Sequence, residues 1–160
     1  MKDSQKSYTF YGRDVYVYTA AKLASGKITF EQVGKKINKE QLVRLKYKKA
    51  VISNNKVSGI IPVLDIKYGN VWTNINRELF DKLGGKLGDE YNVVIKYKNS
   101  VKYSKIIPYY HTFSDTKIGD PLIYLNSLDF ISISLNKDNF AKKYNIQTGD
   151  NWIFEITKVI

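Results

Sequence analysis

The feature that most constrains the fold is a series of short strand-like runs that begins near residue 42 and continues to the end of the chain. In runs such as LVRLKYK, YNVVIKYK, FISISLN and WIFEITKV, apolar or β-branched side chains alternate with polar ones. Alternation with a period of two places successive side chains on opposite faces of a strand. The intervening segments, such as SNNK, KNS and TGDN, are rich in turn-forming residues. The pattern therefore predicts a mainly β domain of short strands, either a barrel or a sandwich.

The first part of the chain has a helical pattern instead. We therefore expect a helical linker segment over 1–42 and a β domain over 43–160. Within the linker, DVYVYTAAKLAS predicts a helix over 14–25, with Asp14 as its N-cap and Gly26 directly after its end.

Two shorter helices are predicted inside the β domain. The segment RELFDKL follows Asn76, and the segment NFAKKY follows Asp138. Asn and Asp side chains accept hydrogen bonds from the free N–H groups at the start of a helix, so these two residues are the predicted N-caps. Each helix leads into a Gly-Asp turn and a strand, which makes a weak internal repeat.

The composition and motif content exclude several kinds of site. The chain has no cysteine, so neither disulfides nor thiolate metal sites are possible. His111 is the only histidine, and we expect neither a catalytic triad nor a metal site around it. No Gly-rich phosphate-binding motif occurs. The N-terminus MKDSQKSYTF lacks the apolar region of a signal peptide, and no window resembles a membrane span, so we expect a cytoplasmic protein with no membrane partner.

The formal net charge of +11 would attract nucleic acid or another anionic partner. The basic residues are nearly all lysines spread along the chain, whereas arginine occurs only at positions 13, 44 and 77. Because bidentate recognition of bases depends mainly on arginine, we do not expect nucleic acid to be the partner of this protein. A basic, non-catalytic β-barrel that binds nucleic acid through its lysines remains an alternative function.

The stretch VLDIKYGNVWTNI holds the strongest candidate for a binding site. Its Gly69-Asn70 pair interrupts a strand-like run and would bring Tyr68 and Trp72 close together where two strands end. Two aromatic rings can enclose a planar group, and an Asn amide offers a donor and an acceptor that complement the edge of adenine. Asp65 could hold an ammonium group beside them. The other interpretation is a hairpin whose two aromatic residues belong to the core.

Four ordered blocks connect this stretch to a known family. They are TFYGRDVYVYTAAKLASG, DIKYGNVWTNI, HTFSDTKIGDPLIYLNS and ISISLNKDNFAKKYNIQTGD. With these blocks, residues 8–160 resemble the C-terminal half of the S-adenosylmethionine (SAM) dependent adenosyltransferases. That family includes the hydroxide adenosyltransferases (SAM hydrolases), the fluorinase and the chlorinase.

The resemblance implies a small antiparallel β-barrel of about seven strands with short helices. It implies that SAM binds at a subunit interface of a homotrimer, between the N-terminal domain of one chain and the C-terminal domain of its neighbour. The reaction implied is an SN2-type attack on C5′ of the ribose by water, hydroxide or halide. SAM is then the substrate, and no cofactor or metal is needed. The residues implied around adenine are Tyr68, Asn70, Trp72 and Phe113, and those implied to hold the methionine amino group are Asp65 and Ser127.

Departures from the family pattern favour a hydrolase, which would convert SAM and water to adenosine and L-methionine. Leu128 and Leu135 stand where the halogenases carry arginines, which disfavours a halogenase. Tyr11 stands where the hydrolases usually carry a histidine that helps to orient water, so the catalytic residues stay unassigned. The family's N-terminal domain is absent from this chain, and we expect the chain alone to be incomplete and inactive. A degenerate structural module of the same family is a further alternative.

Overall fold

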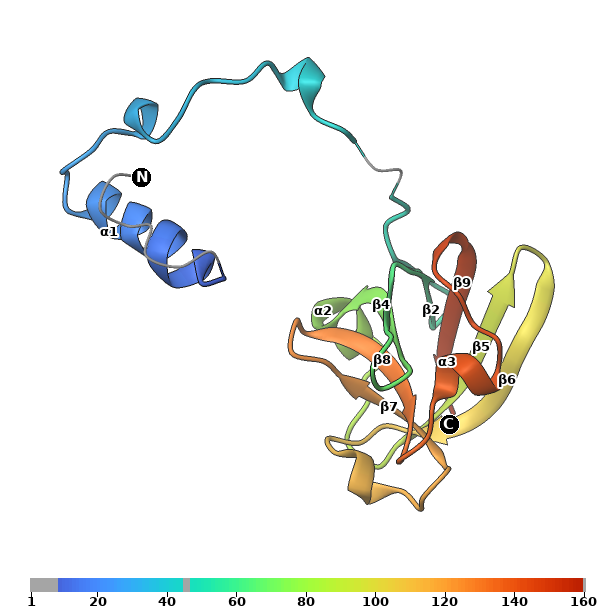
Figure 1. Cartoon of the computed structure of the whole chain (residues 1–160). Helices are drawn as coiled ribbons and strands as arrows, with labels where there is room; N and C mark the ends of the chain where they lie inside the picture. The colour runs from blue at the N-terminus through green and yellow to red at the C-terminus, as the bar shows by residue number, and fades with distance from the viewer. Residues whose placement is uncertain (1–8, 45–46, 160) are drawn as a thin grey trace. The chain divides into compact units, whose positions relative to one another are not determined.

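In a computed structural model, the described residues are 9–44 and 47–159, and the chain divides into two units, Met1–Leu45 and Lys46–Ile160 (Figure 1). The described part of the N-terminal unit contains four short helical elements: the π-helix η1 (Gly12–Val17), the α-helix α1 (Tyr18–Ala24) and the 3-10 helices η2 (Phe30–Gln32) and η3 (Lys39–Gln41). Among the described residues, no helix is long and apolar enough to cross a membrane.

The predicted N-terminal helix forms, but its start differs from the prediction. Gly26 follows the end of α1 with a φ of +67°, and the N–H of Lys27 donates to the carbonyl of Lys22 at 2.9 Å. This is the expected glycine-terminated C-cap. Asp14 is not the N-cap, because helical structure already begins at η1. Its carboxylate instead accepts hydrogen bonds from the neighbouring Arg13.

The C-terminal unit has nine antiparallel strands over 47–159, arranged in two sheets (Figure 1). The five-stranded sheet has the order β1 (Val51–Ser53), β2 (Lys56–Ile61), β9 (Gly149–Lys158), β5 (Glu90–Tyr97) and β6 (Ser100–Pro108). The four-stranded sheet has the order β3 (Val63–Asp65), β4 (Asn70–Asn76), β8 (Phe130–Leu135) and β7 (Pro121–Leu125). The predicted mainly β, antiparallel class is confirmed, with two sheets where the resemblance implied one barrel of about seven strands.

Pro62 accounts for part of the difference in strand number. The run KVSGIIPVLD has the pattern of one strand, but β2 ends at Ile61 in the five-stranded sheet and β3 begins at Val63 in the four-stranded sheet. Proline has no N–H group to donate to a ladder. The chain therefore passes from one sheet to the other at this residue.

Side chains from both sheets contribute to one hydrophobic core. Its fully buried members include Val57, Val93 and Phe154 from the five-stranded sheet and Val71 and Ile133 from the four-stranded sheet. Along β5, buried Tyr91, Val93 and Ile95 alternate with residues that are more exposed. The period of two in the sequence is thus the burial pattern of the strand.

The helix α2 (Arg77–Asp81) follows β4 and begins as predicted. The Oδ1 atom of Asn76 accepts a hydrogen bond from the N–H of Leu79 at 3.0 Å, so Asn76 is the N-cap. Phe80 from this helix is buried in the core. The short helix is thereby anchored to the sheets.

The prediction for the helix α3 (Phe140–Lys143) was wrong by one residue. Its N-cap is Asn139, whose Oδ1 accepts from the N–H of Lys142 at 2.7 Å. Asp138 accepts instead from the N–H of Asn139 and pairs with Lys143. Both residue types cap helices well, so the sequence pattern alone did not distinguish them.

Candidate functional site

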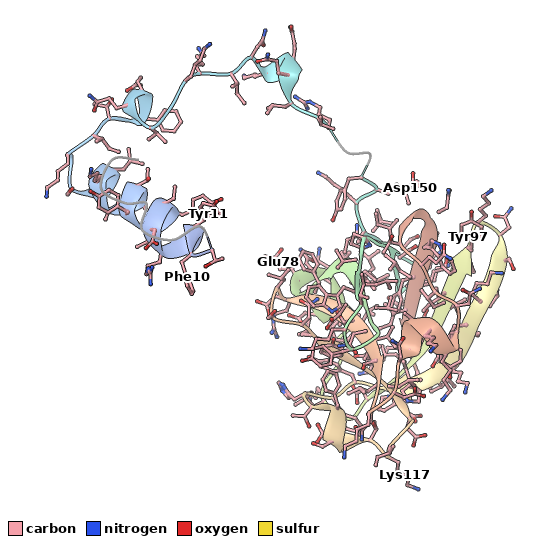
Figure 2. All side chains as sticks on the ribbon, in the orientation of Figure 1. Phe10, Tyr11, Glu78, Tyr97, Lys117 and Asp150 are labelled. Carbon is pink, nitrogen blue, oxygen red and sulfur yellow. The ribbon has the colours of Figure 1, made fainter. Side chains whose placement is uncertain are left out.

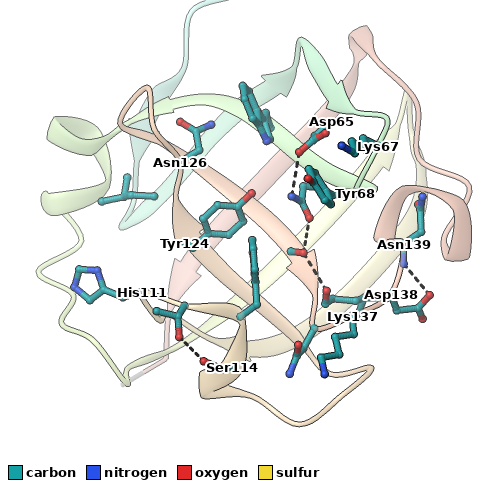
Figure 3. A pocket seen from close by; sticks show the side chains of 18 of the residues that line it. Asp65, Lys67, Tyr68, His111, Ser114, Tyr124, Asn126, Lys137, Asp138 and Asn139 are labelled. Atoms are coloured by element: carbon teal, nitrogen blue, oxygen red, sulfur yellow. Dashed lines mark hydrogen bonds between the residues drawn. The ribbon is translucent and has the colours of Figure 1, made fainter.

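One cavity of the C-terminal unit, with a volume of about 1140 Å³, brings together segments that are far apart in the sequence (Figure 3). It is lined by the β3–β4 turn, the β6–β7 connection, the β7–β8 turn and the segment between β8 and α3. All six binding residues singled out from the sequence line it: Asp65, Tyr68, Asn70, Trp72, Phe113 and Ser127. Their roles in binding stay predictions.

The β3–β4 turn is stabilised by hydrogen bonds within the turn and by one hydrogen bond from α3. The N–H groups of Tyr68 and Gly69 donate to the carbonyl of Asp65 at 3.2 and 2.7 Å. The carbonyl of Gly69 in turn accepts from the N–H of Ala141 in α3 at 3.0 Å. Gly69 has a φ of +76°, and a Cβ atom there would lie only 2.1 Å from Cγ of Asn139. A larger residue would therefore be strained at this position and would displace the Asn139 side chain, whereas glycine lets the turn pack directly against α3.

The aromatic residues around the cavity are partly open to solvent. Tyr68 is 61% exposed and Phe113 is 41% exposed, while Trp72 is partly buried. Phe113 lies in the 3-10 helix η4 (Phe113–Asp115) and lines the cavity. Ser114, from the same helix, lies across the cavity from Tyr68 (Figure 3). A hairpin forms, as the second interpretation of this stretch required. Its two aromatic side chains, however, line a cavity instead of completing the core.

Asn70 is held by two neighbours on the wall of the cavity. Its side chain is almost fully buried, and its Nδ2 atom donates to Oδ2 of Asp65 at 3.4 Å. Its Oδ1 atom accepts a hydrogen bond from Oγ of Ser134. The candidate adenine contact and the candidate ammonium anchor are thus directly hydrogen-bonded to each other.

Tyr124 is a cavity residue that the sequence analysis missed. Its ring packs edge-to-face against Phe113, with centroids 5.1 Å apart. Burial, together with the nearby carboxylate of Asp65, raises the pKa of Tyr124 to about 12, although interactions with Trp72 and Ser132 oppose the shift. Like any tyrosine hydroxyl at neutral pH it is protonated, so it can donate a hydrogen bond in the cavity, and the raised pKa extends this to alkaline pH.

Ser127 lies on a turn that is fixed by a buried side chain. The Oδ1 atom of Asn126 accepts from the N–H groups of Leu128 and Phe130 at 2.9 and 3.2 Å. Its Nδ2 atom donates to Oγ of Ser132 at 3.0 Å. Ser127 itself is exposed at the cavity, so its hydroxyl is available to a ligand.

Charged groups of both signs line the cavity. They include Asp65, Lys67 and Lys137, and the single histidine, His111, also lies there. Among the described residues, no group of three or more His, Cys, Asp or Glu side chains could hold a metal ion. Tyr11 is exposed in the N-terminal unit, and its role stays a prediction.

The residues that sequence analysis missed share one property. Tyr124, Asn126 and Ser134 belong to PLIYLNS and FISISLN, which have the apolar or alternating patterns of ordinary strands. The available signal was the polarity of FISISLN, where both serines are buried. Buried hydroxyl and amide groups need partners, so they mark places where strands exchange side-chain hydrogen bonds.

Comparison with known proteins identifies relatives of this chain. The family model described as the SAM hydroxide adenosyltransferase C-terminal domain matches residues 59–153. Two fluorinases are similar over 143 residues, or 88% of this chain: one from Actinopolyspora mzabensis at 31% identity and one from Actinoplanes sp. (strain N902-109) at 32%. The matched region is 46% of each fluorinase, so the chain spans about half the length of these curated relatives.

Solved structures have the same fold. A crystal structure of an uncharacterized conserved protein from Thermotoga maritima matches with a TM-score of 0.66 and 30% identity, over 94% of this chain and 53% of that one. A conserved hypothetical protein from Thermus thermophilus matches with a TM-score of 0.50 and 22% identity, over 93% and 52%, which supports the fold alone. Since the family model covers more than half of the chain, the protein belongs to the SAM hydroxide adenosyltransferase C-terminal domain family.

Proposed function

We propose that this chain is the substrate-binding C-terminal part of a SAM-dependent adenosyltransferase, and that the complete protein is a SAM hydrolase. The observation that carries the proposal is the convergence on one cavity of the six residues that the sequence resemblance implies. They come from three separate segments, and only the folded chain brings them together.

The chemistry of the cavity suits the two ends of SAM. Tyr68, Trp72 and Phe113 offer ring faces or edges to the adenine, and stacking contributes about 1–3 kcal/mol for each base–aromatic contact. Asp65 supplies a negative charge and Ser127 a hydroxyl for the methionine ammonium group. A polar anchor beside an aromatic slot fixes the orientation of a ligand that has a planar base at one end and a charged amino-acid group at the other.

The proposed reaction needs little covalent chemistry from the protein. As water attacks C5′ of the ribose, the C5′–O bond forms and the C5′–S bond breaks. Methionine leaves with the electron pair, and the proton of water passes to solvent. The positive charge on the sulfonium already makes methionine a good leaving group. The protein therefore acts mainly by positioning and desolvating the nucleophile. Leu128 and Leu135 carry no positive charge that would attract a halide, so we propose water as the nucleophile.

We also propose that a second chain completes the site, as an N-terminal domain in a homotrimer. Tyr68 and Phe113 line the cavity yet remain substantially exposed. Ile66 and Leu128, each next in sequence to a lining residue, are exposed as well. Exposed apolar side chains around a binding cavity are typical of a surface that another protein covers. The matched fluorinases are about twice as long as the matched region, which leaves room for such a domain in the complete protein.

The proposal is tested by titrating the full chain with SAM and following backbone amide and indole resonances by NMR. Trp72→Ala should weaken SAM binding about tenfold or more, because it removes a ring that would stack on adenine. Tyr47→Ala removes an exposed aromatic that does not line this cavity, and it should leave the affinity unchanged. Equal losses for both variants would count against the adenine slot.

A second set of experiments tests the reaction and the alternative functions. Adding an N-terminal domain from the family should give adenosine and methionine from SAM. A halogenated nucleoside as the main product would overturn the choice of a hydrolase. No turnover despite SAM binding would favour a module that has lost activity. Oligonucleotide binding that falls steeply with salt, without any response to SAM, would favour the basic nucleic-acid-binding module.

A further inference from the structure

Asn126 lines the cavity at the start of the turn between β7 and β8 (Figure 3). Its Oδ1 atom accepts from the N–H groups of Leu128 and Phe130 at 2.9 and 3.2 Å. Its own N–H donates to the carbonyl of Phe130 at 3.0 Å, and its carbonyl accepts from the N–H of Asp129 at 2.9 Å. One residue thus takes part in four hydrogen bonds within the turn, and the next residue is Ser127, the candidate partner of the ligand's ammonium group.

The two backbone donors determine how the amide of Asn126 lies. A backbone N–H can only donate, so both groups require the oxygen side of the amide. The Nδ2 atom then faces β8, where it donates to Oγ of Ser132 at 3.0 Å. A serine hydroxyl can donate or accept, so Ser132 adapts to the amide and does not set its orientation. Asn126 is only 8% exposed and Ser132 is fully buried, so water does not compete for this bond.

The bond to Ser132 attaches the turn to the part of the sheet that carries the aromatic residues. In the strand register, Ser132 lies opposite Trp72 on β4 and opposite Tyr124 on β7. Residues directly opposite each other in antiparallel strands point to the same face of the sheet. Trp72 and Tyr124 both line the cavity. Asn126 therefore fixes the position of the turn with respect to the proposed adenine slot.

The far end of the turn is held by a different contact. The carbonyl of Asp129 accepts from the N–H of Arg77 in α2 at 2.9 Å, and its carboxylate pairs with the guanidinium of Arg77 at 2.8 Å. Neither residue lines the cavity. Loss of the Asn126 side chain would therefore free the part of the turn that carries Ser127, while the far end stays attached to α2.

We propose that Asn126 is a positioning residue, which holds the hydroxyl of Ser127 for the ammonium group of an adenosyl amino acid; this inference rests on the proposed function. Ser127 is exposed at the cavity, and on an unconstrained turn its hydroxyl would sample many positions. Restricting these positions on binding costs conformational entropy, so a turn that is already fixed favours binding. Ligands without the amino-acid part gain nothing from it, because the adenine end would contact Tyr68, Trp72 and Phe113.

The inference is tested by NMR titration of the full chain with S-adenosylhomocysteine and with 5′-methylthioadenosine. Both have an uncharged sulfur, and only the first carries an amino-acid part. The unchanged chain should bind S-adenosylhomocysteine about tenfold more tightly. Asn126→Ala should reduce this ratio about threefold or more. Asn126→Asp should preserve it, because a carboxylate accepts from the same two N–H groups and can also accept from Ser132.

Asn74→Ala is the matched control, because it removes another buried asparagine that bonds to two segments. The Oδ1 atom of Asn74 accepts from the N–H of Ile60 and its Nδ2 atom donates to the carbonyl of Lys48, both at 2.7 Å and outside this cavity. This variant should leave the ratio of affinities unchanged, whatever its effect on stability.

A double variant shows whether Asn126 acts through Ser127. Ser127→Ala removes the hydroxyl and should itself reduce the ratio. In that background Asn126→Ala should cause no further reduction, because the hydroxyl that it positions is already absent. A merely structural role predicts reductions that add.

The outcomes separate the inference from the proposed function. Binding of neither compound would overturn the proposed function and the inference with it. Equal affinity of the unchanged chain for both compounds would overturn the inference while the adenine slot stands. An undiminished ratio in Asn126→Ala, a ratio in Asn126→Asp as low as in Asn126→Ala, or additive reductions in the double variant would overturn the role of Asn126.

A measurement on the unchanged chain covers the case in which Asn126→Ala does not fold. The backbone amide hydrogens of Leu128 and Phe130 should exchange with water more slowly than unprotected amides, because both are bonded to Asn126. The amide resonances of Ser127 and Leu128 should shift on addition of S-adenosylhomocysteine and much less on addition of 5′-methylthioadenosine. Unprotected exchange before ligand is added, or equal shifts with both compounds, would overturn the inference.

Discussion

The two units of the chain contain helices of similar length that differ in what they bury. The elements η1, α1, η2 and η3 of the N-terminal unit have no buried residue, and Phe10 and Tyr11 at its start are exposed (Figure 2). In the C-terminal unit, α3 has only four residues yet buries Phe140 and Ala141. Helix stability in proteins comes mainly from packing of an apolar face. The β unit therefore determines the folding stability and the candidate site, and each prediction below compares one residue from each unit.

The largest difference is expected between two phenylalanines. Phe140 is fully buried and packs against Tyr103 and Tyr144, with ring centroids 4.9 and 4.7 Å apart. Phe140→Ala should lower the free energy of unfolding by about 3–5 kcal/mol, because it removes core contacts and leaves a cavity. Phe30→Ala, at a position that is 80% exposed, should change it by less than about 0.5 kcal/mol.

Urea denaturation followed by tryptophan fluorescence measures both changes. The two tryptophans lie at positions 72 and 152, so the signal reports on the C-terminal unit. A loss from Phe30→Ala comparable to that from Phe140→Ala would break the comparison between the two units.

A smaller difference is expected between two glycines with similar backbone angles. Gly69 and Gly26 have φ values of +76° and +67°, but only Gly69 has a neighbour within 4 Å of a Cβ atom, namely Asn139. Gly69→Ala should cost about 2 kcal/mol or more, from backbone strain and the clash, and should also weaken SAM binding.

Gly26→Ala should introduce backbone strain without a steric clash, at the end of an exposed helix. It should reduce helicity in far-UV circular dichroism and leave the denaturation midpoint of the C-terminal unit unchanged. Equal midpoints for both variants would show that the packing of the β3–β4 turn against α3 contributes little.

The smallest difference is expected between two ion pairs. Glu155 on β9 pairs with Lys96 at 2.7 Å and Lys56 at 3.2 Å, which join neighbouring strands. Burial would raise the pKa of Glu155, but the hydrogen bonds and charges of the two lysines outweigh it and lower the pKa. The pair of Arg13 and Asp14, by contrast, joins adjacent residues.

Glu155→Gln should lower the free energy of unfolding by about 1 kcal/mol at neutral pH. Because the folded-state pKa is below the unfolded value, the stabilisation is present above the unfolded pKa and is lost as the pH falls through the folded pKa. Denaturation at several pH values should therefore show the variant and the unchanged chain converging in acid. Arg13→Gln should give no measurable change in the midpoint. A Glu155→Gln effect that does not depend on pH would contradict this account.

Local patterns predicted a large part of the fold, and long-range contacts decided the rest. The period of two identified the strands. Asn76 identified the start of α2 and Gly26 the end of α1. These features depend on neighbours in sequence, so they can be predicted from local patterns. The single run across Pro62 did not predict that its two halves join different sheets. The sequence also did not distinguish Asp138 from Asn139 as the N-cap of α3, since both residue types cap helices well.

For the candidate site, the sequence by itself determined the family, the mainly β class and six residues that could bind SAM. Only the tertiary structure decided that these six line one cavity, and that Tyr124, Asn126 and Ser134 support them. The physical reason is strand pairing. The alternation in one strand says which face a side chain occupies, whereas its hydrogen-bond partner depends on the register with a strand that is up to 64 residues away, as for Asn70 and Ser134.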